Sequence, residues 1–350
     1  MTVYVAVDFH ARQQTISYCD LADGEIHRLE LHHQRDNVRA FYAGLKGEVI
    51  IGFEASGYSA WFEQMLAELG HTFWLGNPAE IRRKAPRRQK NDRRDADHML
   101  ELMLKGDFPR LHTFSNESRL VLRQLRFRHK LVKVRTIAKN SLHAIGINAG
   151  LPLKRQLLTE KGIRQLQALP LSPVLAQQRD EWLQLIAFVN QRIARVEADL
   201  QQIADKDADT ALLQTHPGIG LLTSLALRYT LLPVSRFSTT RQVTAYAGLD
   251  CIEDQSSERR RMGSISKAGS RLLRYLLNEA GQTACRKDPE LKRFYQRLLL
   301  RRERPKAKVA VARKLLVRSF IMLRDQIDYA EFVRRGVAAR VACHPHSLND

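Results

Sequence analysis

The sequence predicts an α+β protein of several domains, in which a mixed sheet at the N-terminus is followed by a helical middle and a mostly helical C-terminal part. Three observations predict this division. Strand-like and helical runs alternate over the first 80 residues, a heptad pattern fills the middle, and the charge changes sign between the first part and the rest. The 350 residues suffice for two or three domains with cores of their own. We expect domains at 1–110, 111–210 and 211–335 and a tail at 336–350.

The N-terminal part has the pattern of a mixed α/β sheet. Its strand-like runs are short and rich in β-branched or aromatic residues, and Gly70 is a stop signal for the second of its two helical runs. The expected strands are 2–8, 14–21, 26–32, 48–53 and 72–75, and the expected helices are 38–45, 59–69 and, farther along, 90–104.

The middle part carries apolar residues at alternating spacings of four and three. They are Trp182, Ile186, Val189, Ile193, Val196, Leu200 and Ile203. This spacing predicts a coiled coil, formed by antiparallel pairing or by dimerisation, and residues 117–145 carry a similar stripe that fits a partner helix. An ordinary core helix is the alternative. Between the two helices, the glycines and prolines of 150–173 predict a turn region.

A third part begins near Thr215 with the motif His216-Pro-Gly-Ile-Gly220 before an apolar helix. This pattern is typical of a helix-hairpin-helix turn, in which glycines let backbone N–H groups approach a DNA phosphate. The same residues also suit a plain helix C-cap.

The charge of the chain is strongly basic and unevenly placed. Lys and Arg number 57 against 37 Asp and Glu, yet residues 1–80 hold 5 against 11. The cations concentrate in 82–94, 119–139 and 286–318, which predicts nucleic acid as the partner; a solvated surface is the plainer reading. The candidate nucleic-acid contacts in the first two clusters are Arg82, Arg83, Lys84, Arg87, Arg88, Arg123 and Arg126.

Other function classes are disfavoured. No run of 18 apolar residues is present to span a bilayer, and the N-terminal residues lack the features of a signal peptide. The four cysteines have no CxxC spacing, which argues against a disulfide scaffold or a zinc module. We therefore expect a cytoplasmic protein, associated with the nucleoid.

Four carboxylates are candidate metal ligands. Asp8 and Glu54 end two strands, and Asp92 and Asp95 lie about 60° apart around one predicted helix, with Asp97 off their face. Acids at the ends of buried strands are costly unless a cation meets them. Mg²⁺, with Mn²⁺ as an alternative, prefers carboxylate oxygens, and a pair of such ions can hold the oxygens of a phosphodiester. Each acid alone also fits a cap, a turn or a salt-bridged surface.

At these residues the chain resembles a known family. The segments VAVDFH (5–10), IGFEASG (51–57) and KNDRRDADHML (90–100) are similar to those of the DEDD transposases of the RNA-bridged insertion-sequence class, to which the Piv-type DNA invertases are related. The resemblance continues through HPGIG (216–220), AYAGL (245–249) and 255–277, and spans about residues 1–330. It implies a RuvC-like, RNase H-type N-terminal domain whose four acids map onto Asp8, Glu54, Asp92 and Asp95.

The resemblance also implies a catalytic serine after the AGL segment, at Ser256, which attacks a phosphodiester and holds the DNA strand as a phosphoserine. Arg259, Arg260, Arg261 and Lys267 then fit contacts to the nucleic acid. The sequence departs from the family where Ser257 replaces a frequent glycine, so Ser257 is an alternative nucleophile. Cys251 replaces a frequent proline, and His10 stands where smaller residues are common. From composition alone, the two serines would be linker residues.

The resemblance thus implies a DNA transposase or recombinase that acts on donor and target DNA, guided by a structured RNA. It also implies a dimer that pairs to a tetramer, in which the acids of one protomer meet the serine of another. A hydrolytic RuvC-like nuclease or junction resolvase is the alternative enzyme, and an architectural DNA- or RNA-binding protein is the non-enzymatic alternative. A site-specific DNA invertase would share the chemistry of the first interpretation.

Overall fold

The computed structural model describes residues 2–33, 35–85, 92–151, 156–256 and 259–343. Within these ranges the side chains of 35–36, 92–93, 253–256, 259–262 and 337–343 are outside the description. The chain forms two compact units, Met1–Phe114 and Ser115–Asp350. None of the described helices has both the length and the apolar character needed to cross a membrane.

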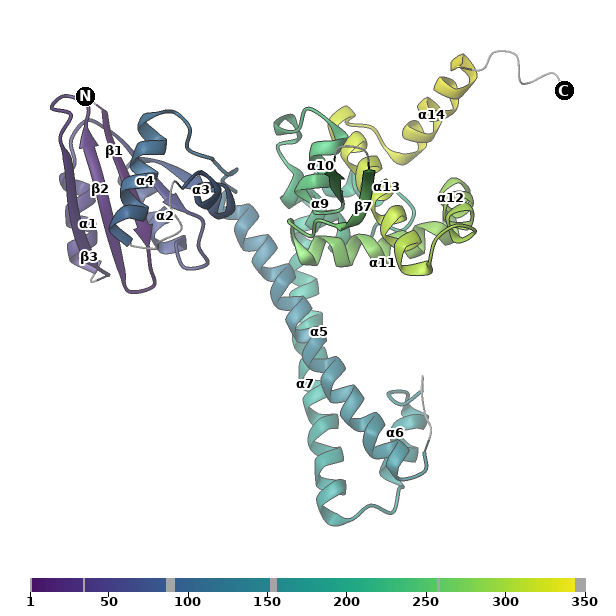
Figure 1. Ribbon diagram of the computed structural model, residues 1–350. Coiled ribbons are helices and arrows are strands. Elements are labelled where there is room, and N and C mark those ends of the chain that lie inside the picture. The colour runs from purple at the N-terminus through teal and green to yellow at the C-terminus, as the bar shows by residue number, and fades with distance from the viewer. Residues whose placement is uncertain (1, 34, 86–91, 152–155, 257–258, 344–350) are drawn as a thin grey trace. The chain divides into compact units, whose positions relative to one another are not determined.

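The first unit is built on a five-stranded mixed sheet (Figure 1). Its order is β3-β2-β1-β4-β5; β1 pairs antiparallel with β2 and parallel with β4, while β2–β3 is antiparallel and β4–β5 parallel. This confirms the predicted strands to within one residue at each end. The strands are β1 (Thr2–Phe9), β2 (Gln13–Asp20), β3 (Ile26–His32), β4 (Glu48–Glu54) and β5 (Thr72–Gly76).

The two faces of this sheet carry different helices. Strand alternation sends Val5, Val7 and Phe9 to one face, where they pack with α1 (Arg35–Gly44) and α2 (Ala60–Glu68). Ala6 lies on the other face and packs with α4 (Asp92–Leu104). This second face is the one on which the strand-end acids lie.

A short helix precedes α4 that the sequence analysis did not anticipate. This helix is α3 (Pro78–Lys84). The side chain of Asn77, the residue before it, accepts a hydrogen bond from the backbone N–H of Ala79, and Pro78 occupies the first turn. Both residues are start signals for a helix. The sequence therefore contained the information for α3.

The second unit begins with two long helices, α5 (Asn116–Asn148) and α7 (Pro173–Ala204), that pack along one another. Five of the seven heptad residues are buried: Ile186, Val189, Ile193, Val196 and Leu200. The predicted pairing of 182–203 with 117–145 is thereby confirmed, while a supercoiled geometry stays a prediction. The expected turn region carries a further helix, α6 (Glu160–Gln167), because Thr159 caps it by accepting from the N–H of Gly162.

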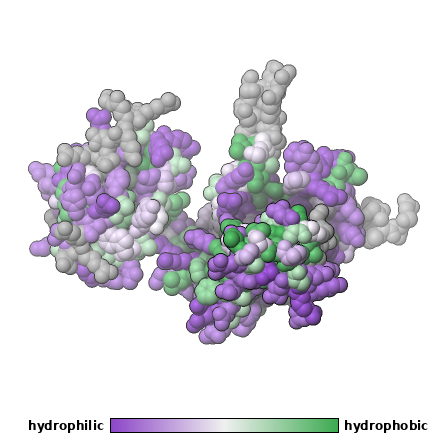
Figure 2. All heavy atoms as spheres, turned by 90° about the horizontal axis from the view of Figure 1, so that it is seen from below, coloured by the Kyte–Doolittle hydropathy of each residue, from purple (hydrophilic) through white to green (hydrophobic). Residues whose placement is uncertain are grey.

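The rest of the second unit is mostly helical, as predicted. On one face of this unit, apolar residues gather among polar ones (Figure 2). One hairpin interrupts the helices. The elements are α8 (Ala208–Gln214), α9 (Leu221–Leu231), η1 (Val234–Arg236), α10 (Thr240–Tyr246), β6 (Cys251–Ser256), β7 (Arg259–Ile265), α11 (Arg271–Lys287), α12 (Pro289–Leu299), α13 (Arg304–Asp325) and α14 (Tyr329–Cys343). Since α14 continues through Gly336 to Cys343, the segment expected as a tail begins inside a helix.

Candidate active site

Asp8 and Glu54 occupy neighbouring positions at the carboxyl ends of two parallel strands. The register pairs Ala6 with Gly52 and Val7 with Phe53, so Asp8 and Glu54 are the next positions along β1 and β4. Asp8 is buried, with 8% of its surface exposed, and Glu54 is partly buried. Two acids on one face at one edge of a sheet repel each other unless a cation lies near them.

The helix α4 brings a third acid to this face. Asp95 lies in its first turn, directly before Ala96 and one turn before Met99, which are both buried against the sheet. Asp95 itself is partly buried. Asp92 is the first residue of α4, one turn before Ala96, and its side chain lies outside the described residues.

Gly52 leaves room for the Met103 side chain between α4 and the sheet. A Cβ atom at Gly52 would lie 2.3 Å from the Met103 sulfur, and the other nearest atoms also belong to the flexible Met103 side chain, which would have to move. Gly52 therefore accommodates one core side chain of the helix that carries Asp95. The sequence pattern did not predict this contact.

The ligand chemistry of these acids suits a hard divalent cation, but the described acids do not lie close enough together to hold one. Carboxylates of Asp8, Glu54 and Asp95 are the oxygen ligands that Mg²⁺ and Mn²⁺ prefer, and the described residues near them include no thiolate that would favour a softer metal. The described side chains do not contain a group of three or more His, Cys, Asp or Glu close enough to hold an ion. His10 contacts Asp8, with its Nε2 3.1 Å from Oδ2.

Asp97 has a different environment from the other acids of α4. It accepts hydrogen bonds from the Ser17 hydroxyl at 2.6 Å and from Arg28 Nε at 2.8 Å. A carboxylate with a cationic partner of its own serves the packing of α4 on β2 and β3. This agrees with the expectation that Asp97 lies off the face of Asp92 and Asp95.

The candidate nucleophile lies in the second unit, on the β6–β7 hairpin. Ser256 is the last residue of β6 and pairs in register with Arg259 of β7. The side chains of Ser256 and of Arg259, Arg260 and Arg261 are outside the description, and Ser257 falls outside the described residues altogether. The hairpin was not predicted from the sequence, because its polar, charged strands lack the alternation of a half-buried sheet.

The base of this hairpin is fastened at both ends. Gly248 has φ +67°, and a Cβ there would lie 2.6 Å from the backbone nitrogen of Ala268. Ser266 donates a hydrogen bond to the Asp250 carboxylate, and Arg274 donates to the carbonyls of Ala247 and Gly269 at 3.1 and 2.6 Å. The segments 245–249 and 264–269 therefore have a structural role, because their contacts hold the two ends of the hairpin together.

The predicted nucleic-acid contacts are placed as follows. Arg82, Arg83 and Lys84 form the last turn of α3 and are exposed, Arg123 and Arg126 are exposed on α5, and Lys267 is exposed after β7. Lys84 also donates to the carbonyl of Asp107 at 2.7 Å. Arg87 and Arg88 lie outside the described residues.

The motif His216-Pro-Gly-Ile-Gly220 joins α8 to α9, and its two glycines have different environments. A Cβ at Gly218, where φ is +106°, would lie 2.6 Å from the backbone nitrogen of Ala284 on α11. Gly218 is therefore required for packing within the protein, a role that the sequence pattern did not predict. Of the two glycines, Gly220, which caps α9, has open space where a Cβ atom would lie.

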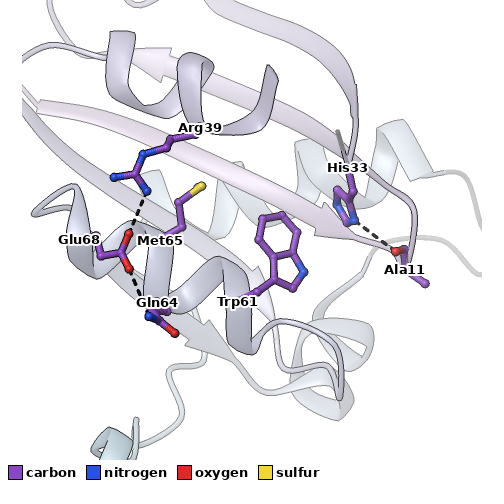
Figure 3. Close-up of a pocket in the computed structure, with 7 residues that line it drawn as sticks. All are labelled: Ala11, His33, Arg39, Trp61, Gln64, Met65 and Glu68. Carbon is purple, nitrogen blue, oxygen red and sulfur yellow. Dashed lines mark hydrogen bonds and ion pairs between the residues drawn. The ribbon is translucent and has the colours of Figure 1, made fainter. Parts of the chain in front are cut away.

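A hollow of about 570 Å³ lies on the opposite face of the sheet in the first unit, beside α1 and α2 (Figure 3). Its charged residues are already paired, since Arg39 donates to Glu68 at 2.9 Å, and His33 Nδ1 lies 3.2 Å from the carbonyl oxygen of Ala11. Burial lowers the pKa of His33. Its described lining residues include none of the candidate acids, and it lies on the other face of the sheet from Asp8 and Glu54.

Comparison with known proteins matches both units. The DEDD transposase model of the IS110 group, described as "Transposase", matches residues 5–145, and a model described as "Transposase IS116/IS110/IS902 family" matches residues 210–296. Together the two models span more than half of the chain.

Individual relatives agree with these family models. The chain is 28% identical to a "probable family 20 transposase" of Pseudomonas aeruginosa over 80% of this chain and 85% of the relative. It is 25% identical to the transposase for insertion sequence element IS1111A of Coxiella burnetii, over 78% and 76% of the two chains. It is also 26% identical to the transposase for IS1328 of Yersinia enterocolitica, over 65% and 68%.

The sheet with its strand-end acids and the matched domains define a DNA transposase, an enzyme with a DEDD-type N-terminal domain. The chain belongs to the IS110/IS116/IS902 family of insertion-sequence transposases.

Proposed function

We propose that this transposase cuts and rejoins the strands of its insertion element through a covalent link between Ser256 and DNA, assisted by divalent cations at Asp8, Glu54, Asp92 and Asp95. The observation that carries the proposal is the placement of the acids on one face of the sheet. Asp8 and Glu54 are adjacent in register, and α4 packs on the same face with Asp95 in its first turn.

In the proposed cleavage, a bond forms between Ser256 Oγ and phosphorus while a bond from phosphorus to a sugar oxygen breaks. The serine proton leaves to a carboxylate or to solvent, and the released sugar oxygen gains a proton. Rejoining reverses these changes with the hydroxyl of the partner strand, so no external energy source is required. Bound Mg²⁺ would neutralise charge on the phosphate and favour the ionised nucleophile.

Three parts of the proposal concern partners. The exposed cations of α3 and α5 suit donor and target DNA, and a structured guide RNA is added by the family resemblance. On α5, Leu120, Phe127 and Val134 lie seven residues apart and are exposed, a stripe that suits a second copy of the chain. We propose a dimer that pairs to a tetramer, acting in the cytoplasm on nucleoid DNA.

The metal site is tested by paired substitutions on α4. Asp95→Asn removes a proposed ligand and is expected to lower strand cleavage by about 100-fold or more. Asp97→Asn removes the same charge two residues away, where the acid is held by Arg28 and Ser17, and is expected to cost less than about fivefold. Cleavage of element-end DNA with Mg²⁺, with Mn²⁺ and with EDTA provides the measurement. Equal losses in the two variants would contradict the assignment.

A further inference from the structure

A hollow of about 480 Å³ lies beside the base of the β6–β7 hairpin, between that base and the helices α11 and α13. Its polar lining comes from Lys267 and from one face of α11: Arg271, Arg274, Tyr275 and Asn278. These four helix positions are spaced three and four residues apart, so they lie along a single stripe. The hollow is thus attached to the hairpin that carries Ser256.

Two cations of this hollow lie at the N-terminus of a helix, where acidic residues are ordinarily favoured. Arg271 and Arg274 lie in the first turn of α11, which contains no acidic residue, although a helix N-terminus already carries positive potential. Arg274 is held by the carbonyls of Ala247 and Gly269. Among the described residues, no ion pair or side-chain hydrogen bond is found for Lys267 or Arg271. Such an excess of positive potential is stabilised by an anion.

The backbone at Lys267 supports the same conclusion. Lys267 has φ +56°, a left-handed conformation that costs free energy for a residue with a side chain, and its N–H donates to the carbonyl of Gly248 at 3.2 Å. Glycine would avoid this cost. A lysine at this position instead places a cation in the lining of the hollow, at the end of the hairpin.

The hollow also contains a stacking surface and a buried acceptor. The ring of Tyr275 is 44% exposed and lies 4.8 Å from the ring of His129 on α5, which supports it from one side. Asn278 Oδ1 is buried without a hydrogen-bond partner among the described residues. An exposed aromatic ring beside cations binds an unstacked base next to its phosphate, as in proteins that hold single-stranded nucleic acid. A duplex keeps its bases stacked and offers no base to the ring.

We infer that this hollow holds one unpaired DNA strand next to the serine hairpin, with Lys267 and Arg271 contacting phosphates and Tyr275 stacking on a base. The inference rests on the proposed function for the identity of the strand, because DNA held at the base of the hairpin would lead along it toward Ser256 at the tip. Arg274 acts as a positioning residue, since its donors fasten the two ends of the hairpin.

Binding of the full-length protein to a labelled single-stranded oligonucleotide of the element end tests the inference, by fluorescence anisotropy in EDTA so that no strand is cut. We expect Lys267→Ala with Arg271→Ala to weaken binding about tenfold and to lower the slope of log K against log salt by roughly 1.4. Tyr275→Ala is expected to weaken binding about tenfold, and Tyr275→Phe, which keeps the ring, less than twofold. The control, Lys161→Ala with Arg164→Ala on α6, removes two exposed cations far along the chain and leaves binding within twofold.

Three results would overturn the inference: equal weakening in the α6 control, unchanged binding in the hollow variants, or an effect confined to RNA of the same sequence. The assay needs neither metal nor cleavage. If it succeeds while no protein–DNA link forms, the serine mechanism fails and the strand site stands; if the link forms while binding is unchanged, only the strand site fails.

Discussion

His216 is a fully buried histidine in a cationic neighbourhood of the second unit. Its ring lies 4.5 Å from the ring of Tyr329, and its Nδ1 lies 3.1 Å from the carbonyl oxygen of Pro217. Burial, and next the positive charge of Arg318, lower the pKa of His216 to about 4. Arg318 in turn forms a buried ion pair with Asp288, which also accepts from the Tyr329 hydroxyl at 2.8 Å. A neutral His216 therefore belongs to the folded state.

Because His216 is buried in its neutral form, we predict that acid lowers the stability of the folded chain. The folded chain keeps His216 neutral down to about pH 4, whereas the unfolded chain takes up the proton near pH 6.5. Between these values the unfolded state binds more protons, so the free energy of unfolding falls as the pH is lowered, by up to about 3 kcal/mol in total. Melting temperatures at pH 7, 6, 5 and 4 measure the effect. His216→Gln removes the titration, and we expect a smaller decrease across this range; an identical decrease would contradict the assignment.

At the scale of elements, α4 packs on the sheet in part through a contact between Gly52 and Met103. We predict that Gly52→Ala lowers the free energy of unfolding by about 1–3 kcal/mol, because the added methyl group overlaps the Met103 sulfur. Met103→Ala alone leaves a cavity and costs about 2–5 kcal/mol. The loss in free energy of unfolding of the double variant is expected to be smaller than the sum of the two single losses by at least about 1 kcal/mol. Urea denaturation of the four proteins measures this difference. Additive losses would show that a methyl group at Gly52 does not compete with the Met103 side chain for space.

Sequence reasoning succeeded for the elements whose side chains alternate between core and solvent. The strands of the sheet, α4 and the paired helices α5 and α7 each bury one regular face, so their periodicity was visible. The β6–β7 hairpin was missed because its fold depends on Gly248, Asp250 and Arg274 at its base, which are contacts between distant segments. The packing role of Gly218 was missed because its contact with α11 cannot be read from the local sequence.

At the scale of the whole molecule, the acids and the candidate serine belong to different units of the chain. The proposed chemistry requires both: the acids to bind divalent cations and the serine to carry the strand. A hydrolytic nuclease would require the acids alone. The two enzymes therefore differ in one observable, which is the presence of DNA linked covalently to the protein.

The most direct test is to express the protein with its flanking DNA, denature it in SDS and look for protein-linked DNA. We predict a linked species in the wild type that is absent from Ser256→Ala and from Asp8→Ala, with peptide mass spectrometry locating the phosphodiester on Ser256 rather than Ser257. Cleavage that persists in Ser256→Ala, with no linked species in the wild type, would contradict the serine mechanism and leave a metal-dependent hydrolase.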